Sequence, residues 1–522
     1  MEWIGRSARY PGYNELHAEH IERRWTDSSA RTWDWEAPRT ETVAAMGDGG
    51  DGDDVGGASL ALFASRIVTQ AIGFAALVYY ARELGAAALG VFFTFETVVA
   101  VLGITSEFGV SGAVTKRMSQ ATSGVERGRY LTGAFALACV PFGVVTVGVV
   151  AFGRRLVNYV GLPEVVPLLV LVLAVNLGAQ VLISALRGER RVAVTAWVGL
   201  AGQLVRVAVS VGLLLAGFGP VALVYGIAAA SITRSATAFG LLDTTPALPS
   251  LATVRSLFDF SKYTAGMEAS DLAYNWADTL VLAAFASKAV VGTYETAWKL
   301  SFVSLLAANV IGIALAPNVT NWHEAGETEK VAAAFRHGVT YSLLFVIPAV
   351  AGAAVLGDEV LHALYGFSAG AAVLLVLLVG QLAQAVKNVS QNVLFGVNRP
   401  EAVFWTNAVT VGANVLLNLA LVPQFGAIGA AVATLATATV AAVAQLHALR
   451  SSIPLSVDAR AVSWQVVVAG AVAGVLLLAR PHVEATTAGV FALAGLAIAV
   501  YGAGVLVHGG MRARLLGATP WG

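Results

Sequence analysis

The chain has 522 residues, of which 57% are hydrophobic and only 12% are charged, and its formal net charge is zero. Ordinary soluble domains carry about 25% charged residues and nucleic-acid-binding proteins are basic, so both classes are excluded. Cys139 is the only cysteine, which also excludes an internal disulfide and a metal cluster held by cysteines.

The first 57 residues differ from the rest of the chain because they are polar and end in a Gly/Asp stretch from Gly47 to Gly57. This composition predicts a disordered cytoplasmic N-terminal tail over residues 1–57. The tail lacks the continuous apolar core of a secretory signal. Met46 precedes the Gly/Asp stretch and is an alternative start, in which case residues 1–45 would not be translated.

Apolar blocks of about twenty residues follow, each long enough to cross a hydrocarbon layer as a helix. They are runs of Leu, Val and Ala without the two-residue alternation of barrel strands. We therefore expect an all-α polytopic membrane protein with about fourteen transmembrane helices. The predicted spans are residues 59–80, 89–112, 130–152, 164–185, 193–216, 219–242, 259–286, 290–316, 339–356, 370–396, 402–422, 426–449, 463–480 and 487–508.

Lys and Arg are distributed unevenly over the segments between these spans. With the N-terminus inside, the cytoplasmic segments hold sixteen of them and the outer loops hold five. Because positive residues are retained in the cytoplasm, this asymmetry predicts that both termini are cytoplasmic, and we expect a plasma-membrane location. The five outer residues are Arg82, Arg154, Arg155, Lys288 and Arg480.

Short motifs recur along the chain at offsets of 202 to 208 residues. Glycine at a tight turn is common in helical hairpins, so a single match would be weak, whereas three matches at similar offsets indicate an internal repeat. The matched pairs are Gly90-Val91-Phe92 with Gly292-Thr293-Tyr294, Leu186-Arg187-Gly188-Glu189-Arg190-Arg191 with Leu394-Phe395-Gly396-Val397-Asn398-Arg399 (L-x-G-x-x-R), and Phe218-Gly219-Pro220-Val221 with Phe425-Gly426-Ala427-Ile428.

The repeat predicts two pseudo-symmetric six-helix bundles, over residues 58–242 and 243–450, related by an axis along the membrane normal. Residues 451–522 lie outside the repeat and are predicted to form two extra transmembrane helices and a cytoplasmic tail. Rocker-type transporters place a central cavity between two such bundles.

A family resemblance rests on the repeated turns, on Arg82-Glu83-Leu84-Gly85 and on Val291-Gly292-Thr293-Tyr294-Glu295-Thr296-Ala297. After residue 57 the chain resembles the polysaccharide flippases of the multidrug/oligosaccharidyl-lipid/polysaccharide exporter superfamily. The resemblance implies a transporter and not an enzyme. It implies that a lipid-linked oligosaccharide, carried on a polyprenyl or dolichyl phosphate or diphosphate, crosses from the inner to the outer leaflet by alternating access. The expected partners are this substrate and membrane lipids, and no nucleic acid.

Ionised side chains inside predicted spans mark candidate binding residues, because a charge at bilayer depth costs at least ~2.5 kcal/mol. We predict that the cavity offers cations to phosphate oxygens, and snorkelling to the membrane surface is the alternative for each of them. Glu295 precedes Lys299 by four residues, so a local pair is expected to neutralise Lys299 in part. The predicted substrate-binding cations are Arg66, Arg206, Lys299 and Lys387.

The predicted seventh span carries Glu268, Asp271, Asn275 and Asp278 at i, i+3, i+7 and i+10, which is one helical face. Such a face lines water or pairs with cations of neighbouring helices. We predict that it lines the cavity and couples transport to H⁺ or Na⁺, with a buried structural ion pair as the alternative. No other cofactor is expected.

The predicted tenth span adds the amides Gln384 and Gln391 to the predicted polar lining. Amide groups suit sugar hydroxyls, but they also hold helices together in a membrane, and the sequence leaves both interpretations open.

Three motifs that usually indicate catalysis or metal binding are incomplete or misplaced here. Gly366-Phe367-Ser368-Ala369-Gly370 has the G-x-S-x-G pattern, which requires a strand-to-helix turn that this chain is not expected to contain. A Gly-Lys pair, required by the Walker A loop, is missing from the sequence. His323-Glu324 lacks the second His of a zinc helix, so no metal site is predicted.

Two other functions remain as alternatives. A cation-coupled multidrug exporter of the same fold would have an acidic or aromatic cavity. A membrane glycosyltransferase or polysaccharide polymerase would present large polar loops with acidic residues, whereas the longest predicted loop, residues 317–338, is short and cytoplasmic.

Overall fold

The computed structural model describes residues 52–483, 486–509 and 511, without the side chains of residues 52–64, Arg66, Met267, 269–274, Ala307 and 313–314. It divides the chain into Met1–Ala58 and a compact unit, Ser59–Gly522. The predicted tail lies outside the described residues up to position 51, and its last residues form the start of helix α2.

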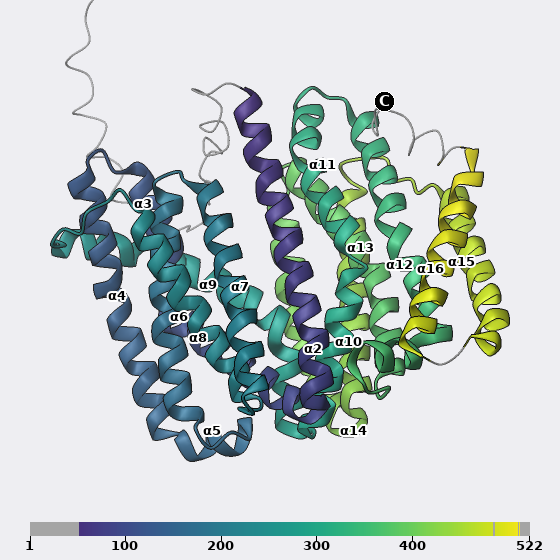
Figure 1. The fold of residues 1–522 in the computed structure, drawn as a ribbon. Coiled ribbons are helices and arrows are strands. Elements are labelled where there is room, and N and C mark those ends of the chain that lie inside the picture. Colours follow the sequence, from purple (N-terminus) through teal and green to yellow (C-terminus); the bar gives the residue numbers. More distant parts are fainter. Residues whose placement is uncertain (1–51, 484–485, 510, 512–522) are drawn as a thin grey trace, which may run out of the picture. The chain divides into compact units, whose positions relative to one another are not determined.

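The described residues form helices and connecting loops, with no strand among them, which confirms the all-α prediction (Figure 1). The helices are α2 (Gly52–Glu107), α3 (Val110–Gln120), α4 (Gly124–Ala151), α5 (Gly153–Val160), α6 (Val165–Gly188), α7 (Val192–Leu215), α8 (Val221–Leu241), α9 (Leu251–Phe285), α10 (Lys288–Val303), α11 (Leu306–Glu324), α12 (Thr328–Tyr365), α13 (Ala371–Gly396), α14 (Pro400–Leu449), α15 (Ala459–Ala479), the 3₁₀ helix η1 (Arg480–His482) and α16 (Thr487–Val507).

Ten helices of the described chain are long and apolar enough to cross a membrane, or eleven if the bent pair Lys288–Val303 and Ala308–Glu324 forms one span. This makes the protein a multi-pass membrane protein. Helices α2 and α14 each consist of two helices joined at a kink, and each covers two of the predicted spans, so the number fourteen stays a prediction.

Glycines interrupt both of these long helices. Gly85 in α2 has φ 72° and ψ 173°, and Gly426 in α14 has φ 55° and ψ −132°. A side chain would clash in these conformations, so only glycine adopts them readily. Gly85 therefore forms a kink between the first two predicted spans, and Gly426 forms one at the start of the predicted span 426–449.

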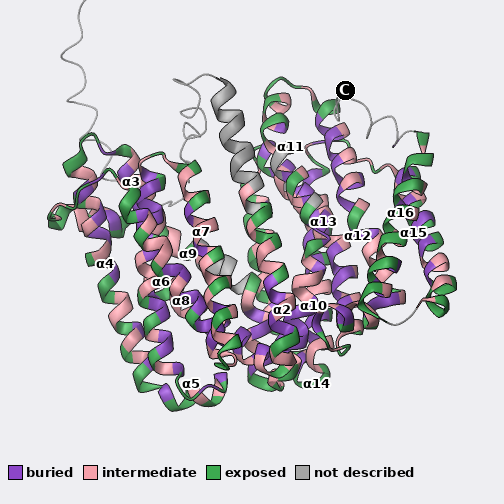
Figure 2. Cartoon of the chain, viewed as in Figure 1, coloured by how far each residue is buried: buried purple, intermediate pink, exposed green. Residues whose placement is uncertain are grey.

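Exposed apolar faces on the described helices are surfaces that lipid tails would cover. On α4, Val140, Val144 and Val147 lie at i, i+4 and i+7, and each is between 68% and 69% exposed. Figure 2 shows exposed residues along the outer sides of the helices. Lipid tails can cover such a face at no cost, whereas a water-soluble protein would have to bury it.

Helix packing follows the chain order in most places. Helix α8 packs on α6 and α7, α13 packs on α11, α12 and α14, and α15 and α16 both pack on α12. Figure 1 shows α15 and α16 together beside α12. Helix α9 packs on α3 and α4 as well as on α14 and so contacts both halves of the repeat. The division into two six-helix bundles stays a prediction.

The two L-x-G-x-x-R segments have the same local structure. Arg190 and Asn398, at the fifth position, have φ 63° and 57°. The next residue donates its N–H to the carbonyl of the first in both segments, from Arg191 to Leu186 at 3.0 Å and from Arg399 to Leu394 at 2.9 Å.

The arginine side chain that ends each segment also has an equivalent role. Arg191 donates to the carbonyl of Leu241 at the C-terminus of α8, and Arg399 donates to the carbonyl of Ala448 near the C-terminus of α14. A cation is stabilised by the free carbonyls at a helix C-terminus. Both turns thus fasten the fourth predicted helix of a repeat to its sixth.

Candidate functional site

A cavity of about 600 Å³, called the large cavity below, lies between α2, α7, α10 and the start of α11. Helices of both repeat halves line it. Its charged lining residues are Glu96, Arg206 and Lys299, so two of the four predicted cations share one cavity. A volume of this size is within the range of sites that bind small molecules.

Arg206 is held by a carboxylate of the same cavity. Its Nη2 lies 3.0 Å from Glu96 Oε1, and the two side chains are 30% and 20% exposed. The guanidinium also lies 6.0 Å from the centre of the Phe92 ring, within cation–π range. Arg206 is therefore fixed in place while part of its surface still faces the cavity.

Lys299 is held by a carboxylate from outside the large cavity. Its Nζ lies 3.9 Å from Glu295 Oε2 and 5.1 Å from the centre of the Phe93 ring. The expected Glu295–Lys299 pair is therefore present. Lys299 is 30% exposed, whereas the Glu295 side chain is only 6% exposed and does not line the large cavity.

Aromatic rings make up much of the remaining wall, and none of them was among the predicted site residues. They come from α2 and α10, and Trp298 and Phe302 stack with ring centres 5.4 Å apart. Aromatic residues are common in membrane helices, so only Trp298 and Phe302, one residue before and three residues after Lys299, could have indicated part of this wall. The aromatic lining residues are Phe74, Tyr80, Phe92, Phe93, Trp298 and Phe302.

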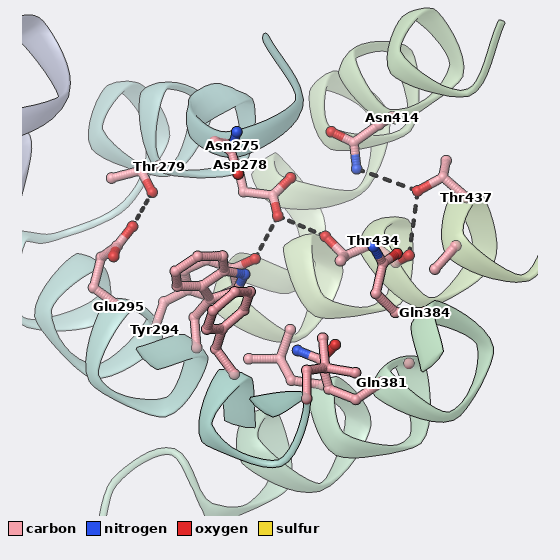
Figure 3. A pocket seen from close by; sticks show the side chains of 16 residues that line it. Asn275, Asp278, Thr279, Tyr294, Glu295, Gln381, Gln384, Asn414, Thr434 and Thr437 are labelled. Carbon is pink, nitrogen blue, oxygen red and sulfur yellow. Dashed lines mark hydrogen bonds between the residues drawn. The ribbon is translucent and has the colours of Figure 1, made fainter. Parts of the chain in front are cut away.

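A second cavity, called the small cavity below, encloses about 70 Å³ between α9, α10, α13 and α14 (Figure 3). Asn275, Asp278 and Gln384 line it, so three of the predicted polar residues meet there. Glu295 lines it too, and its Oε1 accepts a hydrogen bond from Thr279. The space is large enough for water or a small ion.

Asp278 accepts three hydrogen bonds at the small cavity. Its carboxylate accepts from Tyr294 at 2.5 Å, from Thr434 at 2.5 Å and from Asn418 at 2.6 Å. Figure 3 shows the hydroxyls of Tyr294 and Thr434 pointing at it. All three donors are neutral, so these contacts of Asp278 are not the buried ion pair that was the alternative to a cavity-lining face.

The other predicted residues have different positions. The side chains of Arg66 and Asp271 lie outside the described residues. Glu268, Lys387 and Gln391 line neither of the two cavities. Lys387 is 5% exposed on α13, which packs against α10, α11, α12 and α14, and its place in a cavity with Arg206 stays a prediction.

The amides of α13 contact one another. Gln384 donates to Asn388 at 3.1 Å, and Asn388 donates to Asn309 of α11 at 2.9 Å. This chain of amides connects α13 to α11, which agrees with the interpretation that Gln384 holds helices together. Gln384 also lines the small cavity.

At one end of the large cavity, α2 and α10 cross with their backbones in contact. A Cβ atom added to Gly90 would lie 1.7 Å from the carbonyl oxygen of Lys288, and one added to Gly292 would lie 1.9 Å from that of Ala86. Gly90 and Gly292 are the glycines that the repeat matched, and they meet here. The close approach therefore requires glycine on both helices.

Two cations flank this crossing, and each binds a helix C-terminus of the other repeat half. Arg82 donates to the carbonyls of Ala363 and Leu364 at the end of α12, the latter at 3.1 Å. Lys288 donates to the carbonyl of Tyr159 near the end of α5. These contacts are favourable because helix C-termini carry partial negative charge.

Tyr159 adds a further contact between the halves. Its hydroxyl donates to the carbonyl of Leu280 on α9 at 2.7 Å. Burial raises the pKa of Tyr159 to about 12, so the phenol keeps this proton at neutral pH. We call the glycine crossing, Arg82, Tyr159 and Lys288 together the closed end of the large cavity.

Comparisons with known proteins agree with this description. The family model for "Polysaccharide biosynthesis protein" matches residues 80–373, and the model for "Lipid II flippase MurJ" matches residues 275–497. The chain is 30% identical to the probable low-salt glycan biosynthesis flippase Agl15 of Haloferax volcanii, over 81% of this chain and 89% of that one. It is 28% identical to the probable flippase AglR of the same organism, over 80% and 88%.

Solved structures share the fold. The lipid II flippase MurJ in an inward closed conformation superimposes with a TM-score of 0.73 at 12% identity, over 87% of this chain and 99% of that one. An inward-facing multidrug resistance transporter of the MATE family superimposes with a TM-score of 0.54 at 16% identity, over 73% and 94%.

Proposed function

Because the chain belongs to the polysaccharide biosynthesis protein family of the multidrug/oligosaccharidyl-lipid/polysaccharide exporter superfamily, we propose that it is a glycan flippase. It moves a lipid-linked oligosaccharide from the inner to the outer leaflet and is a transporter without catalytic activity. The observation that carries this proposal is the large cavity, in which Arg206 and Lys299 face a space bordered by aromatic rings.

The chemistry of the cavity suits both parts of such a headgroup. Guanidinium and ammonium groups bind phosphate oxygens through charge-assisted hydrogen bonds, so Arg206 and Lys299 would bind a polyprenyl or dolichyl phosphate or diphosphate. The flat faces of Trp298 and Phe302 would pack against the apolar faces of sugar rings. The lipid chain would remain among the acyl chains of the bilayer.

Transport would proceed by alternating access between the two predicted bundles. We propose that the closed end of the large cavity faces the outer surface of the plasma membrane and that both termini are cytoplasmic. The excess of Lys and Arg in the predicted cytoplasmic loops supports this orientation. In this arrangement the substrate enters from the inner leaflet, and the contacts of the closed end must separate before it can leave.

Coupling to H⁺ or Na⁺ would use the small cavity. Asp278 offers a carboxylate there with neutral hydrogen-bond donors around it, so a cation would supply the missing opposite charge. Moving one charge across the membrane would contribute about 2.3 kcal/mol per 100 mV to the driving force.

The proposal is tested by leaflet-resolved transport in proteoliposomes. A fluorescent lipid-linked saccharide is reconstituted with the purified protein, and its loss from one leaflet is followed with an impermeant quencher. We expect Lys299→Ala and Arg206→Ala to slow flipping at least tenfold. Lys262→Ala should not, because Lys262 is an exposed lysine paired with Asp259 outside the cavity. Wild-type flipping rates in both cavity variants would refute the proposal.

A multidrug exporter is the second candidate, and the aromatic wall of the large cavity is the observation that favours it. A deletion strain separates the two functions. We expect it to lose surface glycan and to keep its resistance to cationic drugs. Increased drug sensitivity with intact surface glycan would show that the protein is a multidrug exporter and not a flippase.

A further inference from the structure

We propose that Glu295 and Lys299 form an exchangeable ion pair that couples an anionic lipid headgroup in the large cavity to a monovalent cation in the small cavity. The inference deepens the proposed function and rests on it. It assigns Glu295 as a positioning residue, which acts on the substrate through Lys299.

The geometry of α10 is the first observation. Glu295 lines the small cavity and Lys299 lines the large one, so this ion pair reaches from one cavity to the other. Trp298 and Phe302 line both cavities and form part of the wall between them. A change on one side of this wall therefore reaches the other side through a single turn of helix.

The second observation is the contrast with the other ion pair. Arg206 and Glu96 both line the large cavity and lie 3.0 Å apart. Their charges cancel within that cavity. The Lys299 charge is balanced from the small cavity across 3.9 Å, so the large cavity by itself has a formal surplus of one positive charge. An entering anion is thus drawn to Lys299.

The exchange follows from these charges. When a phosphate oxygen binds Lys299, the ammonium turns from Glu295 toward the anion. Glu295 then keeps the hydrogen bond from Thr279 but loses its opposite charge. Losing the counter-charge destabilises the ionised form of a carboxylate with little exposure, so the affinity of Glu295 for a cation rises.

The surroundings of Glu295 make the small cavity the place for that cation. The charged groups that act on Glu295 are Lys299 of the same helix, Glu96 of α2 and Asp278 of α9. Glu295 and Asp278 line the small cavity together. With Lys299 engaged elsewhere, the cavity holds two carboxylates, and a proton or a sodium ion relieves their repulsion.

The two binding events therefore help each other. By thermodynamic linkage, a cation that tightens headgroup binding is itself bound more tightly when the headgroup is present, by the same factor, which is typically about 5- to 150-fold. A headgroup without a cation and a cation without a headgroup are both disfavoured, which is the requirement for coupled transport.

The test measures binding to the purified full-length protein in nanodiscs. Farnesyl diphosphate is the anionic probe and farnesol the uncharged control. Affinity is determined in sodium-free N-methylglucamine buffer, then with increasing sodium at fixed pH, and separately between pH 6 and 8 without sodium. The last two series distinguish Na⁺ from H⁺ as the coupled cation.

Two carboxylate variants separate coupling from a general change in charge. Both Glu295→Gln and Glu96→Gln remove one negative charge near Lys299 and should tighten binding of the diphosphate. Wild type and Glu96→Gln should bind about tenfold more tightly with the cation than without it. Glu295→Gln should bind farnesyl diphosphate equally tightly with and without the cation, because Lys299 no longer has to leave the Glu295 carboxylate before it binds the diphosphate.

A reciprocal measurement covers the case in which Glu295→Gln does not fold. In Lys299→Gln, Glu295 has no competing partner, so binding of radioactive sodium, or uptake of a proton, should no longer require farnesyl diphosphate. In wild type it should increase when the diphosphate is added.

The outcomes distinguish the two proposals. If wild type binds farnesyl diphosphate no better than farnesol, the proposed function fails and the coupling fails with it. If wild type binds the diphosphate, the function stands. In that case a cation effect that is absent, or that persists in Glu295→Gln, overturns the exchangeable pair.

Discussion

At the scale of single residues, the ion pair between Arg206 and Glu96 holds a cationic side chain in position at the wall of the large cavity. The 3.0 Å contact fixes the guanidinium, and partial exposure leaves room for a ligand. Removing Arg206 alone leaves the Glu96 carboxylate in the cavity, where it would repel a phosphate. The two residues therefore have to be changed together to measure what each contributes.

We expect Arg206→Ala to weaken binding of farnesyl diphosphate about tenfold to hundredfold, since a hydrogen bond to a charged group contributes about 1.5–3 kcal/mol. The double variant Arg206→Ala/Glu96→Ala should bind more tightly than Arg206→Ala, because the repelling carboxylate is gone. Equilibrium binding on the four proteins of this cycle is the measurement. Equal affinities of the single and the double variant would mean that Glu96 does not face the ligand.

Asp278 gives a second prediction at this scale. Asp278→Asn keeps an oxygen for Tyr294 and Thr434 but removes the charge, so flipping should become independent of sodium and of pH. The measurement is the rate of leaflet exchange in proteoliposomes across both series.

Asp259→Asn is the matched control for this change, because Asp259 lies on the same helix, is half exposed and pairs with Lys262. It should keep the ion dependence of wild type. A sodium or pH dependence that survives unchanged in Asp278→Asn would remove the small cavity from the coupling.

At the scale of helices, the crossing of α2 and α10 depends on two glycines. A methyl group on Gly90 would overlap the Lys288 carbonyl, a backbone atom that cannot rotate away. Gly90→Ala should therefore force the helices apart and weaken the closed end of the large cavity. Gly292→Ala should do the same from the other side, because the contact is symmetric.

Accessibility of a cysteine placed at Thr94 measures this opening, in a protein whose Cys139 is replaced by Ser. Thr94 is buried beside the crossing and lies 3.3 Å from Lys288 Nζ. We expect faster labelling by a water-soluble maleimide in Gly90→Ala than in the parent. Gly143→Ala on α4 is the control, since nothing lies within 4 Å of the added Cβ there. Unchanged labelling in Gly90→Ala would show that the crossing adjusts without opening.

Helices also show what the sequence could and could not predict. Equivalent glycines and arginines in the repeat were recognised because turns depend on local conformation, and Arg191 and Arg399 indeed make the same contacts. Which residues share a cavity was harder to predict. Helical spacing shows on which face of its helix a residue lies, but it does not show which other helix packs against that face. Arg206 and Lys387 look alike in sequence, yet Arg206 lines the large cavity, whereas Lys387 lies on α13, which packs on α10, α11, α12 and α14.

At the scale of the whole molecule, the direction of transport depends on which side of the membrane the closed end faces. The crossing of α2 and α10 lies next to Arg82 and Lys288, two of the five positive residues in the predicted outer loops. If those loops are outside, the structure is closed toward the exterior and the substrate enters from the cytoplasmic leaflet. If they are inside, the same contacts would close the cytoplasmic side.

Single cysteines in a Cys139→Ser background decide between these orientations. Glu164 lies in the loop between α5 and α6, close to the closed end, and Ala325 lies between α11 and α12 in the predicted cytoplasmic loop; both are exposed. A membrane-impermeant maleimide should label Glu164→Cys in intact cells and Ala325→Cys only after permeabilisation, because short loops rich in Lys and Arg stay in the cytoplasm. The opposite labelling pattern would show that the protein has the inverse orientation in the membrane. The proposed entry of substrate from the inner leaflet would then be wrong. The proposal that Arg206 and Lys299 bind the substrate in the large cavity would be unaffected.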